Sequence, residues 1–430
     1  MSTDTSAETE IFTRRESQVR SYCRSFDAVF TKARGAEMFD AQGRRHIDFL
    51  AGCSSLNYGH NDPDMKAALQ EHLAGDGIAH GLDMHTTEKA AFLRAYEEII
   101  LRPRGMDHRV MMTGPTGTNA VEAAIKLARK VTGRRNVVAF TNGFHGMTMG
   151  ALALTGNSAK RAGAGGVALG DVTHLPFEGA FGPDTDTLAQ VEMMFDNPSS
   201  GVDAPAAFIF EPVQGEGGLN VASDEWMQRL ERLARRLGAL VIVDDIQSGC
   251  GRTGPFFSFE SAGITPDMIT QAKSLSGFGL PFAALLIRPE HDIWAPGEHN
   301  GTFRGNTHAF VTARVALEKF WRDDRLSLQV AEKARIVRDG LRAIADLVPG
   351  AQLKGRGMMQ GVDVGSGDLA ADICARAFRA GLIIETSGAQ DEVVKILAPL
   401  TIPEDLLQEG LGILYEAAQD ATRTQQLAAE

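Results

Sequence analysis

Cysteine is scarce in this chain and forms neither a metal-binding nor a disulfide pattern. The 430 residues include only Cys23, Cys53, Cys250 and Cys374. There is no C-x-x-C pair and no histidine at metal-ligand spacing. We therefore expect free, buried thiols. Cys250 lies in a glycine-rich turn, where a reactive thiol is the less favoured alternative to plain packing.

Long apolar runs and blocks of basic residues are also missing. No stretch approaches the roughly 20 apolar residues needed to cross a bilayer. The polar, acidic N-terminus lacks the features of a secretory signal or a transit peptide. The net charge is -12, whereas binding to a phosphate backbone requires a basic surface. These absences predict a cytoplasmic protein that binds neither membranes nor nucleic acid.

What is present is an ordinary globular composition, with 43% hydrophobic and 23% charged residues. The length exceeds the size at which a single core stops growing, so two or three units are expected. From Asp62 onward, helical patterns alternate with short apolar runs. The expected helices are 63–73, 87–100, 119–132 and 223–237, and the expected strands are 137–140, 206–210, 240–243, 268–270 and 282–287. Runs that are apolar on both faces and joined by helices predict an α/β fold with a mainly parallel sheet.

Three regions follow from these patterns. Residues 1–61 begin with a frayed tail of about 16 residues, contain two short strands within 37–50, and are expected to join the C-terminal domain. Residues 62–306 form the large domain. Residues 307–430 form a smaller α+β domain that starts with two long helices and ends in about ten loose residues.

Two ionisable residues follow buried strands of the large domain. Asp244 ends the strand in LVIVDD, and Lys273 follows the next predicted strand. Ligands of such sheets bind at the carboxyl ends of the strands. A lone aspartate there is more often a cap or an ion-pair partner, and a lone lysine can extend to water. Each residue alone is therefore weak evidence for a site.

A third element, GPTGT at 114–118, opens the amphipathic helix expected near Asn119. Small residues and free amides at a helix N-terminus favour a phosphate, although such turns often serve only as caps. The combination of phosphate turn, carboxylate and lysine is what pyridoxal 5'-phosphate (PLP) requires. Lys273 would form its Schiff base, and Asp244 would keep its pyridine nitrogen protonated.

From about residue 17 to 415 the chain resembles the class III, fold-type I PLP-dependent aminotransferases. The resemblance is carried by EPVQGEGG, NGFHGMT, DDIQSGCGRTG and KSLSGFGLP, at 211–218, 142–148, 244–254 and 273–281. It implies a large PLP-binding domain with a mainly parallel central sheet and a smaller α+β domain.

The resemblance also implies roles for single residues. Gln247 would bond the ring hydroxyl, while Ile246 and Phe144 would pack on the two faces of the ring. Gly117 and Thr118 match the phosphate-binding turn. Thr302 matches a threonine that reaches the phosphate of a neighbouring subunit, which implies a dimer or a larger homo-oligomer. The role of His145 in FHG stays open.

The sequence departs from the family at two positions. Glu211 matches a glutamate that can pair with a switching arginine, and both are expected at the substrate. The arginine position is occupied by Lys395. A guanidinium that could bind a carboxylate through two hydrogen bonds is thus replaced by a single ammonium group. Asp245 replaces the usual glutamate and predicts a shortened contact.

Within the family the closest resemblance is to the members that act in ectoine biosynthesis, through long strings such as VRSYCRSF, TGPTGTNAVEAAIKLARKVTGR and WAPGEHNGTFRGN. It implies an amino transfer from L-glutamate to L-aspartate 4-semialdehyde, giving L-2,4-diaminobutyrate and 2-oxoglutarate. The alternatives are an ω-aminotransferase acting on ornithine, acetylornithine or 4-aminobutyrate and, from another class, a non-catalytic binding protein with the same fold.

Overall fold

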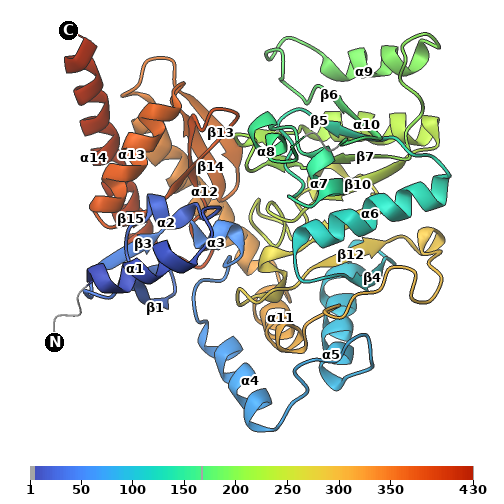
Figure 1. Ribbon diagram of the computed structural model, residues 1–430, viewed down its shortest axis with the longest axis horizontal. Helices are drawn as coiled ribbons and strands as arrows, with labels where there is room; N and C mark the ends of the chain where they lie inside the picture. Colours follow the sequence, from blue (N-terminus) through green and yellow to red (C-terminus); the bar gives the residue numbers. More distant parts are fainter. Residues whose placement is uncertain (1–4, 166–167, 430) are drawn as a thin grey trace.

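The large domain is built on a seven-stranded sheet. The computed structural model describes residues 5–165 and 168–429. In Figure 1 this sheet occupies the right-hand part of the molecule. Its strand order is β4 (Arg109–Met112), β12 (Ala284–Ile287), β11 (Met268–Gln271), β10 (Leu240–Asp244), β7 (Ala207–Phe210), β5 (Val137–Phe140) and β6 (Val172–Leu175). Only β12 runs antiparallel to its neighbours, which confirms the expected mainly parallel sheet.

Helices cover both faces of this sheet because its strands are apolar on both sides. In β5, Val137 and Ala139 pack in the same cluster as α6 (Gly117–Thr132). The alternating residues Val138 and Phe140 pack with α10 (Asp224–Leu237). Successive side chains of a strand point to opposite faces, so α6 and α10 lie on opposite sides. The shorter helices of this region are α7 (Met149–Leu154), α8 (Ser158–Ala162) and α9 (Thr187–Asp196).

The C-terminal region contains two smaller sheets. One has the order β13 (Gln352–Arg356), β14 (Met359–Asp363), β17 (Val393–Ile396) and β16 (Glu385–Ser387). The other has the order β1 (Phe30–Arg34), β2 (Glu37–Asp40), β3 (Arg45–Asp48) and β15 (Leu382–Ile383). The second sheet therefore joins N-terminal strands to a C-terminal one, and the blue and orange segments lie side by side in Figure 1. The accompanying helices are α12 (Arg325–Ala345), α13 (Gly367–Arg379) and α14 (Glu404–Ala429).

The remaining elements connect these regions. Helix α11 (Thr307–Phe320) packs against α4 (Pro63–Ala74) and α5 (Thr87–Ala95). The start of the C-terminal region therefore contacts the helices that precede the first strand of the large sheet. A small hairpin, β8 (Val213–Gln214) and β9 (Asn220–Val221), follows β7. The short helical elements are α1 (Thr5–Arg15), α2 (Tyr22–Ser25), α3 (Ala51–Ser54), η1 (Tyr96–Leu101), η2 (Arg102–Arg104), η3 (Glu260–Ala262), η4 (Lys273–Ser276) and η5 (Pro289–His291).

Several local expectations were wrong. Residues 1–4 of the expected tail lie outside the described residues, and the rest is helical from Thr5. Two arginines in the last turn of this helix interact favourably with the negative end of its dipole. The C-terminal residues are not loose, because α14 continues to Ala429 and buries Ala421 and Thr422. The helix expected over 87–100 ends its α-helical part at Ala95 and continues as a π-helical turn.

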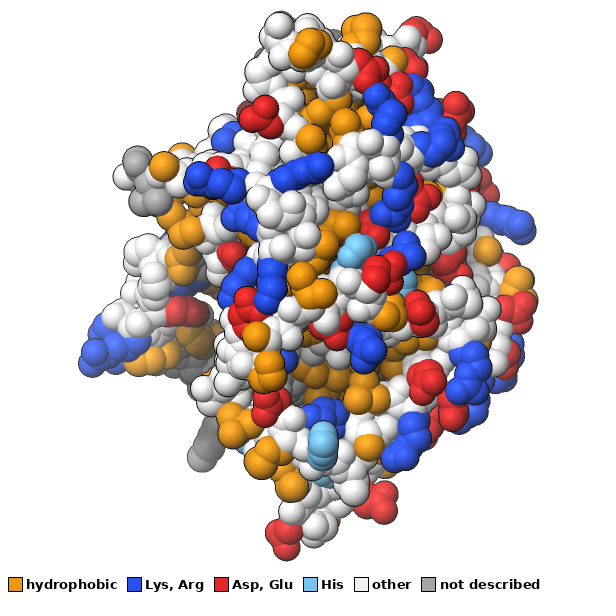
Figure 2. Space-filling model, turned by 90° about the vertical axis from the view of Figure 1, so that its right-hand side faces the viewer, with side chains coloured by type: hydrophobic (Ala, Val, Ile, Leu, Met, Phe, Trp, Pro, Cys, Tyr) orange, Lys and Arg blue, Asp and Glu red, His pale blue; other side chains and the backbone are white. Residues whose placement is uncertain are grey.

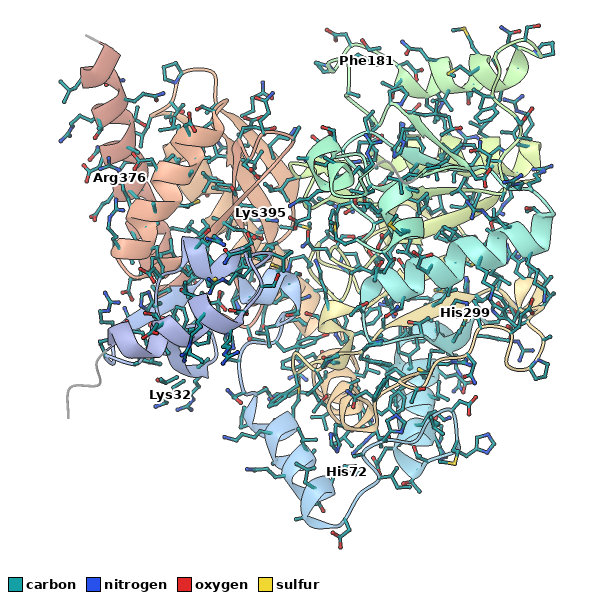
Figure 3. All side chains as sticks on the ribbon, viewed as in Figure 1. Lys32, His72, Phe181, His299, Arg376 and Lys395 are labelled. Carbon is teal, nitrogen blue, oxygen red and sulfur yellow. The ribbon has the colours of Figure 1, made fainter. Side chains whose placement is uncertain are left out.

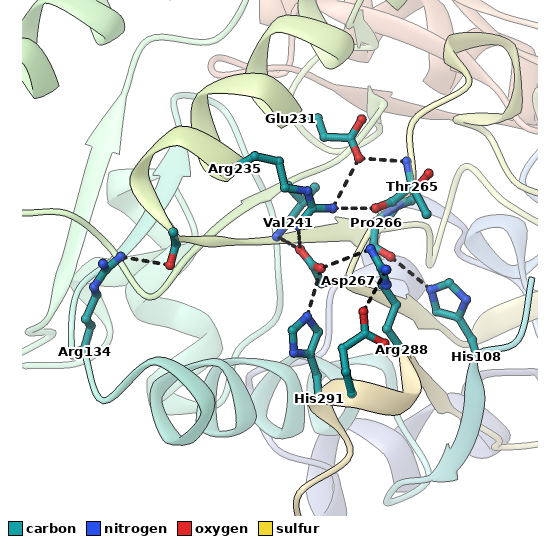
Figure 4. Close-up of polar contacts among 12 residues, drawn as sticks. His108, Arg134, Glu231, Arg235, Val241, Thr265, Pro266, Asp267, Arg288 and His291 are labelled. Atoms are coloured by element: carbon teal, nitrogen blue, oxygen red, sulfur yellow. Dashed lines mark hydrogen bonds and ion pairs between the residues drawn. The ribbon is translucent and has the colours of Figure 1, made fainter.

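The edge of the large sheet opposite the expected site is fixed by Asp267, as Figure 4 shows. This carboxylate is 1% exposed, lies 2.6 Å from Arg235 Nη1 and 3.0 Å from His291 Nε2, and accepts the N–H of Val241. The contacts join α10, β10 and η5 around the start of β11. A buried carboxylate with several partners holds these elements in register.

The described residues include no helix long and apolar enough to span a bilayer. Within the same residues, no group of three or more histidine, cysteine, aspartate or glutamate side chains is placed to hold a metal ion. On the face drawn in Figure 2, side chains of both charges are interspersed with hydrophobic ones.

Candidate active site

The predicted residues meet at a cavity of about 380 Å³ at the carboxyl ends of β10 and β11. Polypeptide from β5, β7, β10, β11 and the start of α6 contributes to it. Eight of the ten predicted site residues line it, namely Gly117, Thr118, Phe144, Glu211, Asp244, Ile246, Gln247 and Lys273. Side chains separated by more than 150 positions in the sequence thus share one hollow of a size suited to a small cofactor.

Asp244 lines this cavity, and three hydrogen-bond donors hold its carboxylate. It is 3% exposed. The Thr270 hydroxyl donates to Oδ1 at 3.0 Å, and the Ile246 N–H donates to the same atom at 3.3 Å. His145 Nδ1 is hydrogen-bonded to Oδ2 at 2.7 Å. Asp244 is therefore fixed in orientation as a buried carboxylate facing the ligand space.

The structure places His145, whose role the sequence left open, against Asp244. Burial by itself lowers the pKa of His145, but the hydrogen bond and charge of Asp244 outweigh it and raise the pKa. A histidine held against the carboxylate orients it and shares its charge. His145 is accordingly a partner of Asp244 as well as part of the cavity wall.

Lys273 follows β11 by two residues, in the turn η4, with φ at +50°. Left-handed backbone is uncommon for a residue with a side chain and is often found at functional sites. Among residues 5–165 and 168–429, none hydrogen-bonds or ion-pairs with the Lys273 amine. Burial lowers the pKa of Lys273, and the charge of Glu216 opposes this shift. The neutral form of the amine is therefore more populated than it would be in water.

The phosphate turn has the required open backbone. Helix α6 begins at Gly117, two residues earlier than expected, with Thr116 as its N-cap. A methyl group on Gly117 would lie 2.8 Å from Cδ1 of Ile246, so glycine keeps the turn close to the cavity wall. The first amides of a helix have no partner within the helix and favour an anion.

Gln247 lines the same cavity and has one acceptor without a partner among the described residues. Its Nε2 donates to Glu216 Oε1 at 3.1 Å, while no described residue donates to its buried Oε1. A hydroxyl on a bound ring would satisfy that oxygen. With the free amine of Lys273, the carboxylate of Asp244 and the helix N-terminus, the residues present fit PLP.

Lys395 does not contact Glu211, contrary to the pairing suggested by the sequence. Its amine lies 2.9 Å from Glu216 Oε1 and 3.0 Å from Glu385 Oε1. Glu211 instead accepts the N–H of Phe144 at 2.8 Å, and burial raises its pKa. The second glutamate of EPVQGEGG, not the first, reaches the lysine, because the hairpin β8–β9 turns it toward β17.

Three other expected residues have defined surroundings. Thr302 is exposed and outside the cavity of its own chain. Asp245 is 1% exposed and accepts hydrogen bonds from Ser248 and Ser258. Cys250 is buried, and burial raises the pKa of its thiol, which supports the packing interpretation.

The described cysteines are all free thiols, but the expectation that they are buried was only partly correct. Cys23 is exposed, and Cys53 and Cys374 are partly exposed. Cys53 lies near the site, with its sulfur 2.8 Å from the Tyr22 hydroxyl.

The sequence interpretation missed Glu216 and Glu385. Glu216 stood in a motif already singled out, so its spacing offered a signal. Glu385 had no signal, because its place beside Lys395 comes from the pairing of β16 with β17.

The family is identified by sequence comparison. The model described as aminotransferase class-III matches residues 20–418. This chain belongs to the class III aminotransferases. Its cofactor is pyridoxal 5'-phosphate, as in that family, and the site described above fits it.

Named relatives are similar over nearly the whole chain. The diaminobutyrate–2-oxoglutarate transaminase of Halomonas elongata is 56% identical, over 96% of this chain and 99% of its own length. The enzyme of the same name from Bordetella parapertussis is 54% identical, over 98% of this chain and 97% of its own.

Solved structures share the fold. The ornithine aminotransferase of Toxoplasma gondii superposes with a TM-score of 0.83 at 24% identity, covering 98% of this chain and 96% of its own. A Bacillus anthracis aminotransferase gives a TM-score of 0.84 at 22% identity, covering 98% and 100%. These similarities confirm the predicted fold-type I architecture.

Proposed function

We propose that this aminotransferase moves an amino group from L-glutamate to L-aspartate 4-semialdehyde, producing L-2,4-diaminobutyrate and 2-oxoglutarate, the first committed step of ectoine biosynthesis. The observation that carries the proposal is the name shared by relatives 52–56% identical to the chain over almost its full length. The presence of Lys273 and Asp244 at one cavity supports an active catalyst and disfavours a non-catalytic binding protein.

Lys273 and Asp244 would act on different parts of the cofactor. When bound, PLP forms a Schiff base with an amine and its protonated ring draws electrons from the adjacent carbon. Lys273 would hold the cofactor between turnovers and then carry the proton between the two carbons within its reach. Asp244, oriented by His145, would keep the ring nitrogen charged.

The other cavity residues would position the ring. Gly117 and Thr118 would bind the phosphate with backbone amides and a hydroxyl. Gln247 would accept the ring hydroxyl, and Ile246 and Phe144 would exclude water from its two faces. Their shared cavity supports this assignment.

We further propose a cytoplasmic homo-oligomer whose smallest unit is a dimer. Thr302 lies on an exposed loop, beside Phe303, which is 65% exposed. A threonine placed there is free to reach a neighbouring subunit's phosphate. For the chain itself, we propose domains at 62–306 and 307–430, with 1–61 joining the latter through the pairing of β3 with β15.

The decisive experiment is a coupled assay of the purified PLP enzyme with diaminobutyrate and 2-oxoglutarate, reading out glutamate. We expect faster turnover of diaminobutyrate than of ornithine, acetylornithine or 4-aminobutyrate, because diaminobutyrate is the amine that appears in the names of the relatives. Faster turnover of ornithine would overturn the substrate assignment.

The catalytic role is tested separately with Lys273→Ala. We expect this variant to lose the visible absorption band that borohydride removes from the wild type, and to lose activity by at least about a thousandfold, the range of a lost proton-transfer group. A variant that keeps the reducible band would contradict the role of Lys273.

A further inference from the structure

Two carboxylates contact one buried lysine beside the active site. Lys395 is fully buried, and its amine contacts Glu216 and Glu385 at 2.9 and 3.0 Å. The Glu385 side chain is 11% exposed and that of Glu216 is 34% exposed. With both acids ionised, this acidic cluster of Glu216, Glu385 and Lys395 carries one negative charge in excess. Excess charge in a half-buried site favours a cationic partner.

The acidic cluster extends from the small domain into the cavity. Glu385 and Lys395 are opposite each other on the paired strands β16 and β17. Figure 3 labels Lys395 in the C-terminal part of the molecule, on the side toward the large domain. Glu216 comes from the hairpin of the large domain and lines the cavity that also contains Lys273. Glu385 lies behind Glu216, and the charges of both carboxylates act on the Lys273 amine.

Within the part of the chain that is described, Lys395 is the one cation that ion-pairs with Glu385, and the more distant Lys273 amine, which also lowers the pKa of Glu385, would be bound to the cofactor in the holoenzyme. Lys395 also serves Glu216. The Cys53 sulfur, 3.9 Å from Oε2, and the Tyr22 hydroxyl bonded to that sulfur bring no positive charge. Burial, together with Glu216 and against the pull of Lys395, raises the pKa of Glu385. A carboxylate in this position gains from an added cation.

We propose that Glu385, together with Glu216, binds the α-ammonium group of a diamino acid substrate and so selects amines that carry this second charge. The inference rests on the proposed function, in which the terminal amine of the substrate would replace the Lys273 amine on the cofactor. The two nitrogens of 2,4-diaminobutyrate are separated by three carbons, about 5 Å when extended with ordinary bond lengths. Because Glu216 and Lys273 line one cavity, an α-ammonium about 5 Å from the reacting nitrogen would be within reach of the acidic cluster.

A matched pair of substrates tests this assignment. 4-Aminobutyrate equals diaminobutyrate without the α-ammonium group. In Glu385→Gln, which keeps the shape and loses the charge, we expect kcat/KM for diaminobutyrate to fall tenfold or more, because a charged hydrogen bond is lost. For 4-aminobutyrate, kcat/KM should stay within about threefold of wild type. The measurement is the rate of cofactor conversion by each amine in the holoenzyme.

Two controls separate binding from folding. Glu404→Gln removes an exposed carboxylate of α14 remote from the cavity and should leave both substrates unchanged. The absorption spectrum and thermal midpoint of Glu385→Gln report whether cofactor and fold are retained. An equal loss for both substrates, or no loss for diaminobutyrate, would overturn the proposal. A variant that does not fold would be replaced by Glu385→Asp, for which preference for diaminobutyrate should persist.

Failure of the proposed function gives a different result. It would appear in the wild type, as poor turnover of diaminobutyrate relative to ornithine. The role of Glu385 is then tested on ornithine against 5-aminopentanoate, which differ by the same α-ammonium group. Selective loss with ornithine would support the assignment, and equal loss would overturn it.

Discussion

Asp245 is buried one residue beyond the carboxylate that faces the cavity, and it points away from the ligand space into a small group of hydroxyls. Ser248 donates to it at 2.9 Å, and the Ser258 N–H donates at 3.2 Å. Burial raises its pKa from the usual 3.8 to about 7, in spite of these donors. The short aspartate that replaces the family's glutamate therefore remains protonated over much of the acidic range.

This shift predicts a pH dependence of stability. Because the folded-state pKa is raised, the unfolded chain loses this proton first, and stability falls as pH rises from about 4 to about 7. Asp245→Asn removes the titration. The free energy of unfolding of the variant, relative to wild type, should therefore increase by about 3 kcal/mol between pH 5 and pH 8.

Urea unfolding at several pH values measures this difference. Asp203→Asn removes an exposed carboxylate and serves as the control. Parallel curves for wild type and Asp245→Asn would show that Asp245 does not carry the pH dependence.

At the scale of elements, the start of α6 decides how the phosphate is held. Gly117 is its first residue and faces Ile246, the residue expected against the ring. A side chain at 117 would collide with Ile246 and displace this wall of the cavity. The glycine matters here for the close approach, not for unusual backbone angles.

We expect Gly117→Ala to weaken retention of PLP by about tenfold, which corresponds to roughly 1.4 kcal/mol. Equilibrium dialysis followed by the visible spectrum measures the retained cofactor. Gly412→Ala is the matched control, since nothing lies within 4 Å of the added methyl group in the exposed part of α14. That variant should keep its cofactor and gain up to about 1 kcal/mol in stability. Unchanged retention in Gly117→Ala would contradict the role of the turn.

At the scale of the whole molecule, the separation of Thr302 from its own cavity gives a test of shared active sites. Lys273→Ala removes the lysine from one subunit, and Thr302→Ala removes the proposed phosphate contact from another. In a mixed dimer, the subunit with intact Lys273 receives intact Thr302 from its partner. One complete site per mixed dimer is then expected, because both substitutions affect the active site of the subunit that carries Lys273→Ala.

Co-expression with two affinity tags isolates the mixed dimer. At limiting PLP we expect about half of the wild-type activity, well above that of either parent variant. Thr302→Ala alone should show weakened retention of PLP. Activity of the mixed dimer no greater than the mean of the parents would show that each subunit completes its own site.

Much of the site was predictable from local patterns. Strands apolar on both faces required covering helices, and the carboxyl ends of such strands are where Asp244 and Lys273 appear. The amphipathic stripe of α6 and the glycine turn before it located the phosphate end. Residues 421–429 were misread because their Gln, Thr and Ala content resembles a loose tail, whereas Ala421 and Thr422 are buried against the domain.

By itself, the sequence determined which chemical groups are available and on which strand ends they lie, because periodicity and turn residues act over short distances. Only the tertiary structure decided which charges meet. The ion pairs of Lys395 with Glu216 and Glu385, and the contact of His145 with Asp244, join residues from separate elements. Such contacts depend on strand register and on how two domains pack, and no local pattern encodes either.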